Sequence, residues 1–107
     1  MIIQVDGDEI RYPINASSSG NNTLLAAIPN RRIVIHQICF TCAAAVTIIF
    51  TDSDGTVLGG PWDFDAKGGA APPVNYTGMF KLAKGKGFVM NLSSAVQVGG
   101  YFTGTLL

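Results

Sequence analysis

Two cysteines and one histidine are the residues of this chain best suited to chemistry. Cys39 and Cys42 have the C-x-x-C spacing found in redox and zinc sites. In such sites the motif lies on a turn or at a helix N-terminus, so that both sulfurs face one point. Here it ends a run of β-branched residues, where an odd spacing sends side chains to opposite faces of a strand. We therefore expect two buried free thiols, without a metal or redox role.

His36 is the only histidine, so any Ser-His-Asp or Cys-His catalytic arrangement would require it. It lies inside an apolar stretch, with Val34 and Ile38 as its same-face neighbours in an extended strand. Catalytic residues usually stand on loops at the rim of a scaffold. We expect a hydrogen-bonded histidine in the core or at an interface, where it could make assembly pH-sensitive, and we expect no enzyme.

Acidic residues form two short motifs. Asp52-Ser-Asp54-Gly55 resembles the start of a calcium loop, but position 12 of that loop is Asp63 and not Glu. A hairpin turn is the better interpretation. Asp63 and Asp65 form a pair of carboxylates without a neighbouring base. We expect a solvated loop there and no metal or other cofactor.

Five large side chains lie in or beside expected loops of this weakly charged chain. Side chains of this kind are enriched at protein interfaces. They could equally cap the open ends of a β-sandwich, and both interpretations stay open. The five are Trp62, Phe64, Tyr76, Met79 and Phe80.

The elements that must position these residues centre on the longest apolar region, 31–51, which contains no Gly or Pro. It predicts strands over 31–41 and 44–51, with a corner near Cys42 and Ala43. The second strand alternates, but the first is apolar on both sides, with Ile33 and Ile35 on one side. In an antiparallel strand with one solvent-exposed face, apolar and polar residues should alternate. We therefore expect either a second sheet with long loops or another subunit to cover both faces.

Short strands and turns continue along the rest of the chain. Residues 1–14 predict an N-terminal hairpin around Asp6-Gly7-Asp8, with an arm as the alternative, and 62–73 predicts the longest irregular region. Strand character resumes over 74–82 and again from Val96 to the end. The pattern is typical of one all-β domain over 1–107, an antiparallel β-sandwich or jelly roll of about eight or nine short strands.

Composition narrows the classes of function. Hydrophobic residues make up 48% of the chain, charged residues only 13%, and the formal net charge is zero. So few charges favour an oligomer or a protein docked on another surface, and nucleic-acid binding is not expected without a basic stripe. The N-terminus lacks a secretory signal and the apolar run 43–50 is too short to span a bilayer. We expect synthesis in a cytoplasm and no membrane partner.

Several short sequence segments resemble those of small structural proteins encoded beside capsid genes in tailed bacteriophages. The similarity covers most of the chain from Asn22 onward but not 1–19. The ending, 101–107, is also similar to the last strand of trimeric jelly rolls of the tumour-necrosis-factor type. The segments are Asn22-Thr-Leu-Leu-Ala-Ala27, Arg31-Arg-Ile-Val-Ile35, Ala45-Val-Thr-Ile48, Leu58-Gly-Gly-Pro61 and Asn91-Leu-Ser-Ser-Ala-Val-Gln-Val-Gly-Gly100.

The resemblance implies a β-sandwich protein of the virion, a decoration or cement protein that sits as a homotrimer on the shell of the major capsid protein. On this hypothesis Ile33, Ile35 and Tyr101 supply trimer contacts. The N-terminal hairpin or the 62–73 loop would meet the shell. Binding the assembled shell but not its loose subunits stabilises the shell by mass action.

Two alternatives belong to other classes. A receptor- or carbohydrate-binding module of a phage tail fibre or bacterial surface protein would place aromatic and acidic residues at one rim, as Trp62, Asp63 and Asp65 could be. A small enzyme of the cupin type needs clustered histidine ligands, which a single histidine cannot supply.

Overall fold

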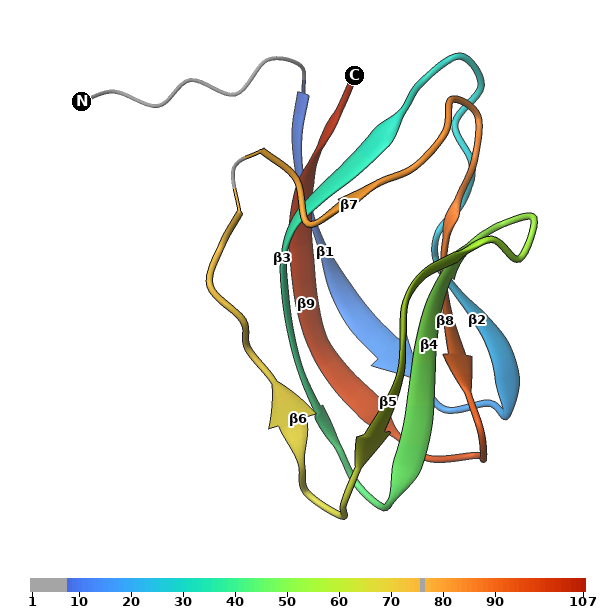
Figure 1. Cartoon of the computed structure of the whole chain (residues 1–107), viewed down its shortest axis with the longest axis vertical. Helices are drawn as coiled ribbons and strands as arrows, with labels where there is room; N and C mark the ends of the chain where they lie inside the picture. Colours follow the sequence, from blue (N-terminus) through green and yellow to red (C-terminus); the bar gives the residue numbers. More distant parts are fainter. Residues whose placement is uncertain (1–7, 76) are drawn as a thin grey trace.

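Two antiparallel β-sheets pack face to face in this chain (Figure 1), as the computed structural model shows for residues 8–75 and 77–107. The first sheet has the order β1-β9-β3-β6, with β7 also paired to β3. The second has the order β2-β8-β4-β5. The predicted all-β sandwich is confirmed. Its strands are β1 (Asp8–Ala16), β2 (Gly20–Leu25), β3 (Ile33–Cys42), β4 (Val46–Asp52), β5 (Val57–Phe64), β6 (Gly69–Ala70), β7 (Phe80–Lys81), β8 (Phe88–Leu92) and β9 (Val98–Leu106).

The apolar region 31–51 forms two strands, as expected, but they belong to different sheets. β3 lies in the first sheet between β9 and the short strands β6 and β7, and β4 lies in the second sheet between β8 and β5. The chain passes from one to the other through the corner 43–45, at the bottom of the view in Figure 1. This corner places the two most apolar strands on opposite walls of one core.

A β-bulge explains why β3 does not alternate along its sequence. The pairing of β3 with β9 shifts register between Ile35 and Gln37, so one extra residue enters β3 at His36. Ile33 and Ile35 before the bulge and Ile38 and Phe40 after it all belong to the buried core. The alternation is therefore kept in each half of the strand, with its phase moved by one residue.

The outer face of β3 is covered by the same chain. Val34 and His36 are only 5% and 7% exposed. Residues 71–75 and 77–79 cross beside them: the Asn75 amide donates to the His36 carbonyl at 2.8 Å, and the Met79 amide donates to the Ile35 carbonyl at 2.6 Å. A loop and the opposite sheet thus account for both buried faces, and no second subunit is needed for this strand.

Aromatic rings fill the centre of the sandwich. Phe50 on β4 lies 5.5 Å from Phe88 on β8 and 6.0 Å from Phe40 on β3, measured between ring centroids. Phe88 in turn contacts Phe102 on β9 at 5.3 Å. These rings come from both sheets, and edge-to-face and stacked contacts of this kind add to the burial of apolar area.

Three local predictions are corrected or left aside. The first strand of the N-terminal hairpin falls on 1–7, outside the described residues, and β1 pairs with the C-terminal β9. Trp62 and Phe64 lie in β5 and not in an irregular loop, since pairing with β4 resumes after a bulge. Of the residues in 74–82 that the structure describes, only Phe80–Lys81 is strand.

The bulge in β5 depends on a glycine. Gly60 has φ of +100°, and a Cβ there would lie 2.7 Å from the Ile48 carbonyl oxygen on β4. Only glycine tolerates both the positive φ and this close approach. The cis peptide bond between Gly60 and Pro61 follows directly. This local irregularity returns Trp62 to the pairing with β4.

Candidate functional site: an aromatic groove at the open side of the sandwich

A hollow of about 940 Å³ opens between the two sheets, on the side formed by β5 and the short strand β6. Its volume lies in the range of about 300–1,000 Å³ that is usual for ligand pockets. We call it the aromatic groove. The main residues that line it are Phe40, Trp62, Phe64, Pro72, Met79 and Phe80.

Trp62 is both a core residue and a surface residue. Its ring packs edge to face against Phe50 at 5.4 Å and lies 6.5 Å from Phe80, yet 38% of the residue is exposed. Phe64, two residues along β5 and on the same face, packs against Phe40 at 5.3 Å. The Trp62 indole packs against core rings on one side and is exposed to solvent on the other. Such a rigid, partly exposed ring is a good anchor for a partner surface.

Four of the five large side chains singled out in the sequence come together here. Trp62, Phe64, Met79 and Phe80 all line the groove. Phe80 is only 8% exposed and closes the side of the core, whereas Trp62 is open to solvent. The interpretation as a cap of the sandwich is thus met by Phe80, and a role of Trp62 at an interface stays a prediction. Tyr76 lies outside the described residues.

The three residues proposed for self-association do not form one surface. Ile33 and Ile35 are 0% exposed and belong to the core, so they offer no side-chain surface to a partner. Tyr101 is half-buried on the outer face of the first sheet. The Arg11 guanidinium lies 4.4 Å from the centroid of its ring, a cation–π contact.

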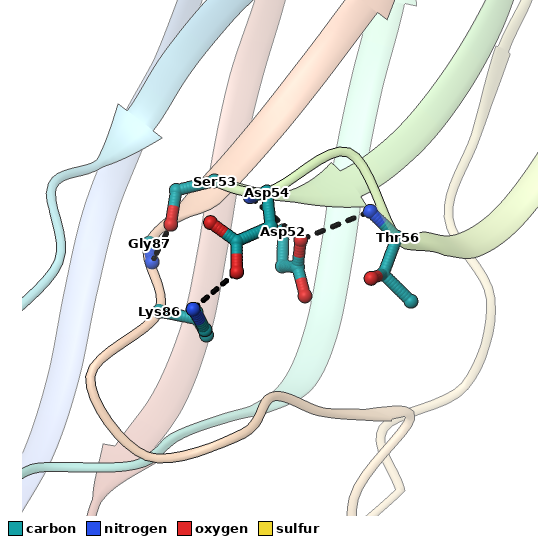
Figure 2. A network of polar contacts seen from close by, with 6 residues as sticks. All are labelled: Asp52, Ser53, Asp54, Thr56, Lys86 and Gly87. Carbon is teal, nitrogen blue, oxygen red and sulfur yellow. Dashed lines mark hydrogen bonds and ion pairs between the residues drawn. The ribbon is translucent and has the colours of Figure 1, made fainter.

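The Asp52–Thr56 segment is a hairpin turn between β4 and β5, as expected. Figure 2 shows one carboxylate oxygen of Asp52 facing the turn, where Oδ1 accepts from the Asp54 amide at 2.8 Å and the Thr56 amide at 3.0 Å. Asp54 pairs with Lys86, and this bond is the first cause that raises the Lys86 pKa. The Asp52 carboxylate thus closes the turn itself, and the Asp54 carboxylate holds the turn to the 84–87 loop.

The acidic rim proposed for carbohydrate binding is not assembled. Asp63 neighbours Trp62 on β5, so its side chain lies on the opposite face of the strand. There it accepts a hydrogen bond of 2.6 Å from the Thr47 hydroxyl of β4. Asp65 is exposed beyond the end of β5. These two carboxylates therefore do not converge on the exposed indole.

The cysteines and the histidine hold structural positions. Cys42 is 1% exposed in the core and burial raises the pKa of its thiol, whereas Cys39 is half-buried; both are free. His36 Nδ1 donates to the Asn75 carbonyl at 2.8 Å, because a carbonyl can only accept, and Nε2 lies 2.9 Å from the Thr105 hydroxyl. In the described ranges no group of three or more His, Cys, Asp or Glu gathers as a metal site would require.

Comparison with known proteins adds no relative. A scan against protein-family models finds no match, and searches of curated proteins and of solved structures find none. In the part of the chain that is described, no helix is long and apolar enough to cross a membrane.

Sequence reasoning missed Phe40 and Pro72 as parts of the groove. Phe40 reads as an ordinary core residue of an apolar strand, and Pro72 as part of a loop. Their meeting with Trp62 depends on the pairing of β6 with β3, at Phe40 and Ala70. A pairing of two residues leaves no periodic signal in the sequence.

Proposed function

We propose that this chain is a structural virion protein, a decoration or cement protein that binds the capsid shell of a tailed bacteriophage through the aromatic groove. The proposal joins the resemblance noted in the sequence to one observation: an exposed Trp62 over an apolar hollow. We propose no catalytic role and no cofactor.

The partner is a surface that offers apolar side chains. Asp63 also borders the groove, but its carboxylate is bound to the Thr47 hydroxyl on the other face of β5; the remaining lining residues are apolar or aromatic. Exposed apolar patches on weakly charged proteins mark docking sites, and an aromatic anchor over a pocket is a frequent energetic centre of an interface. A projecting apolar segment of the capsid protein has this chemistry.

The strand edges support recognition by side chains over pairing by backbone. Pro13, which has no backbone N–H, lies in β1, one outer strand of the first sheet, and the 59–61 bulge interrupts β5, one outer strand of the second. Proline and bulges at edges hinder the addition of a foreign strand. The partner would therefore be bound in the groove and not as an added strand.

Substituting Trp62 tests the proposal. Because Trp62→Ala removes the exposed anchor, it should weaken binding to empty capsid shells by about tenfold or more, measured by co-sedimentation. Val57→Ala is the matched control, since Val57 lies on the same strand, is 58% exposed and does not line the groove. Equal binding by the two variants would contradict the proposal. Trp62→Phe keeps a ring against Phe50 and separates lost binding from lost folding.

A further inference from the structure

The bulge in β3 also builds a feature on the outer face of the first sheet. Since Ile35 and Ile38 both point into the core, the two residues between them, His36 and Gln37, both turn outward. Bulges re-aim side chains in this way and are over-represented beside functional sites. Here the bulge places two neighbouring polar side chains together in the middle of an otherwise apolar strand.

Polar residues of two further strands stand beside them. In the register of the first sheet, Arg11 on β1, Thr103 on β9 and Gln37 on β3 form one row across three strands. Glu9 and Thr105 form the next row. Three adjacent strands therefore present amide, hydroxyl, guanidinium and carboxylate groups on one face.

A hollow of about 520 Å³ lies between these side chains, and we call it the polar hollow. The Arg11 guanidinium lies over the Tyr101 ring, 4.4 Å from its centroid, and among the described residues no ion pair joins it to Glu9. Val74, 39% exposed, supplies an apolar wall on the opposite side. The hollow is separate from the aromatic groove, which lies between the sheets.

The floor of the hollow is already fixed. The two ring nitrogens of His36 are bound by Asn75 and Thr105, and this holds the 71–79 segment against β3. Among the described residues, the side chains of Glu9, Arg11 and Gln37 make no hydrogen bond or ion pair, and Arg11 has only its contact with the Tyr101 ring. A preformed site with free donors and acceptors binds a ligand at lower entropic cost.

We propose that the polar hollow binds a neutral saccharide. Sugar hydroxyls both donate and accept, so they match a carboxylate, a guanidinium and an amide standing together. The single negative and single positive charge offset each other, which disfavours anions such as phosphate. The C–H face of a pyranose ring would pack against Val74. This site would leave the aromatic groove free for a protein partner.

The test is a titration of the ¹⁵N-labelled full chain with glucose, galactose, mannose and N-acetylglucosamine, followed by amide chemical shifts. At least one sugar should give saturable shifts at Gln37 and Thr103, with a Kd of about 1–10 mM. The absence of saturable shifts with all four sugars would overturn the proposal. Tighter binding of glucuronate or phosphate than of every neutral sugar would also overturn it.

Variants locate the site. Gln37→Ala and Glu9→Ala should each weaken binding of the same sugar by about tenfold, the loss of one or two hydrogen bonds. Thr41→Ala, on the same face of β3 but outside the hollow, and Trp62→Ala should bind it as the unchanged chain does. Loss in Trp62→Ala with retention in Gln37→Ala would overturn the proposal and place the sugar in the aromatic groove. Glu9→Ala changes an exposed side chain, so its result does not depend on refolding.

Discussion

Cys39 and Cys42 are close in sequence but lie in different surroundings. Cys42 points into the core, at 1% exposure, and Cys39 points to the outer face and is half-buried. The odd spacing on a strand predicted this separation, because successive side chains alternate between faces. The expectation that both thiols are buried is correct for Cys42 only.

Thiol reactivity should follow this difference. Near pH 8, iodoacetamide should modify Cys39 first and Cys42 only after unfolding, because burial blocks access and raises the pKa of the Cys42 thiol. A raised pKa also means that the folded state is favoured below the unfolded thiol pKa of about 8.5, and that this stabilisation is lost as the pH rises above it. Peptide mass spectrometry after timed alkylation measures the order. Equal rates for the two thiols would contradict the assignment.

Among the elements, the turn from β4 to β5 shows how one side chain can hold a hairpin. Asp52 is 7% exposed and accepts two backbone hydrogen bonds, while Asp54 is exposed and pairs only with Lys86 (Figure 2). Buried hydrogen bonds to a charged group contribute more than an exposed ion pair. The two aspartates therefore differ in their contribution to stability.

Asp52→Ala should lower the free energy of unfolding by about 2 kcal/mol, because two turn amides lose their acceptor. Asp54→Ala is the control and should change it little, since its carboxylate is exposed and its amide remains. Urea denaturation followed by tryptophan fluorescence measures both. A larger loss in Asp54→Ala than in Asp52→Ala would show that the ion pair with Lys86, and not the turn, stabilises the hairpin.

At the scale of the whole molecule, the two apolar faces of β3 no longer argue for self-association, because both are covered within one chain. Ile33 and Ile35 are inside the core, and the outer strands β1 and β5 carry Pro13 and a bulge, which hinder pairing with another copy. The low charge of the chain still favours docking on another surface. We propose that the homotrimer forms on the shell, where neighbouring sites hold three copies close together.

The free chain should then be a monomer. Light scattering over a dilution series in reducing buffer should give the mass of one chain, 11.2 kDa, at every concentration. A mass three times as large that persists on dilution would contradict this and would indicate a trimer interface elsewhere, with Tyr101 as the first residue to substitute.

The sequence by itself determined the all-β class, the two strands of 31–51, the hairpin turn after Asp52 and most of the aromatic cluster. These are local features: β-branched runs, turn residues and period-two patterns act over a few neighbouring positions. The bulge in β3 is also visible in the sequence, because the adjacent polar residues His36 and Gln37 interrupt an apolar strand.

Only the tertiary structure decided which residues meet. Strict alternation places Ile35 and Ile38 on opposite faces, but pairing with β9 admits one extra residue and returns both to the core. The aromatic groove needs β6 beside β3, and the polar hollow needs β1 beside β9. Such pairings join residues far apart in the chain, and their register is set by the packing of both sheets on one core, which no local pattern encodes.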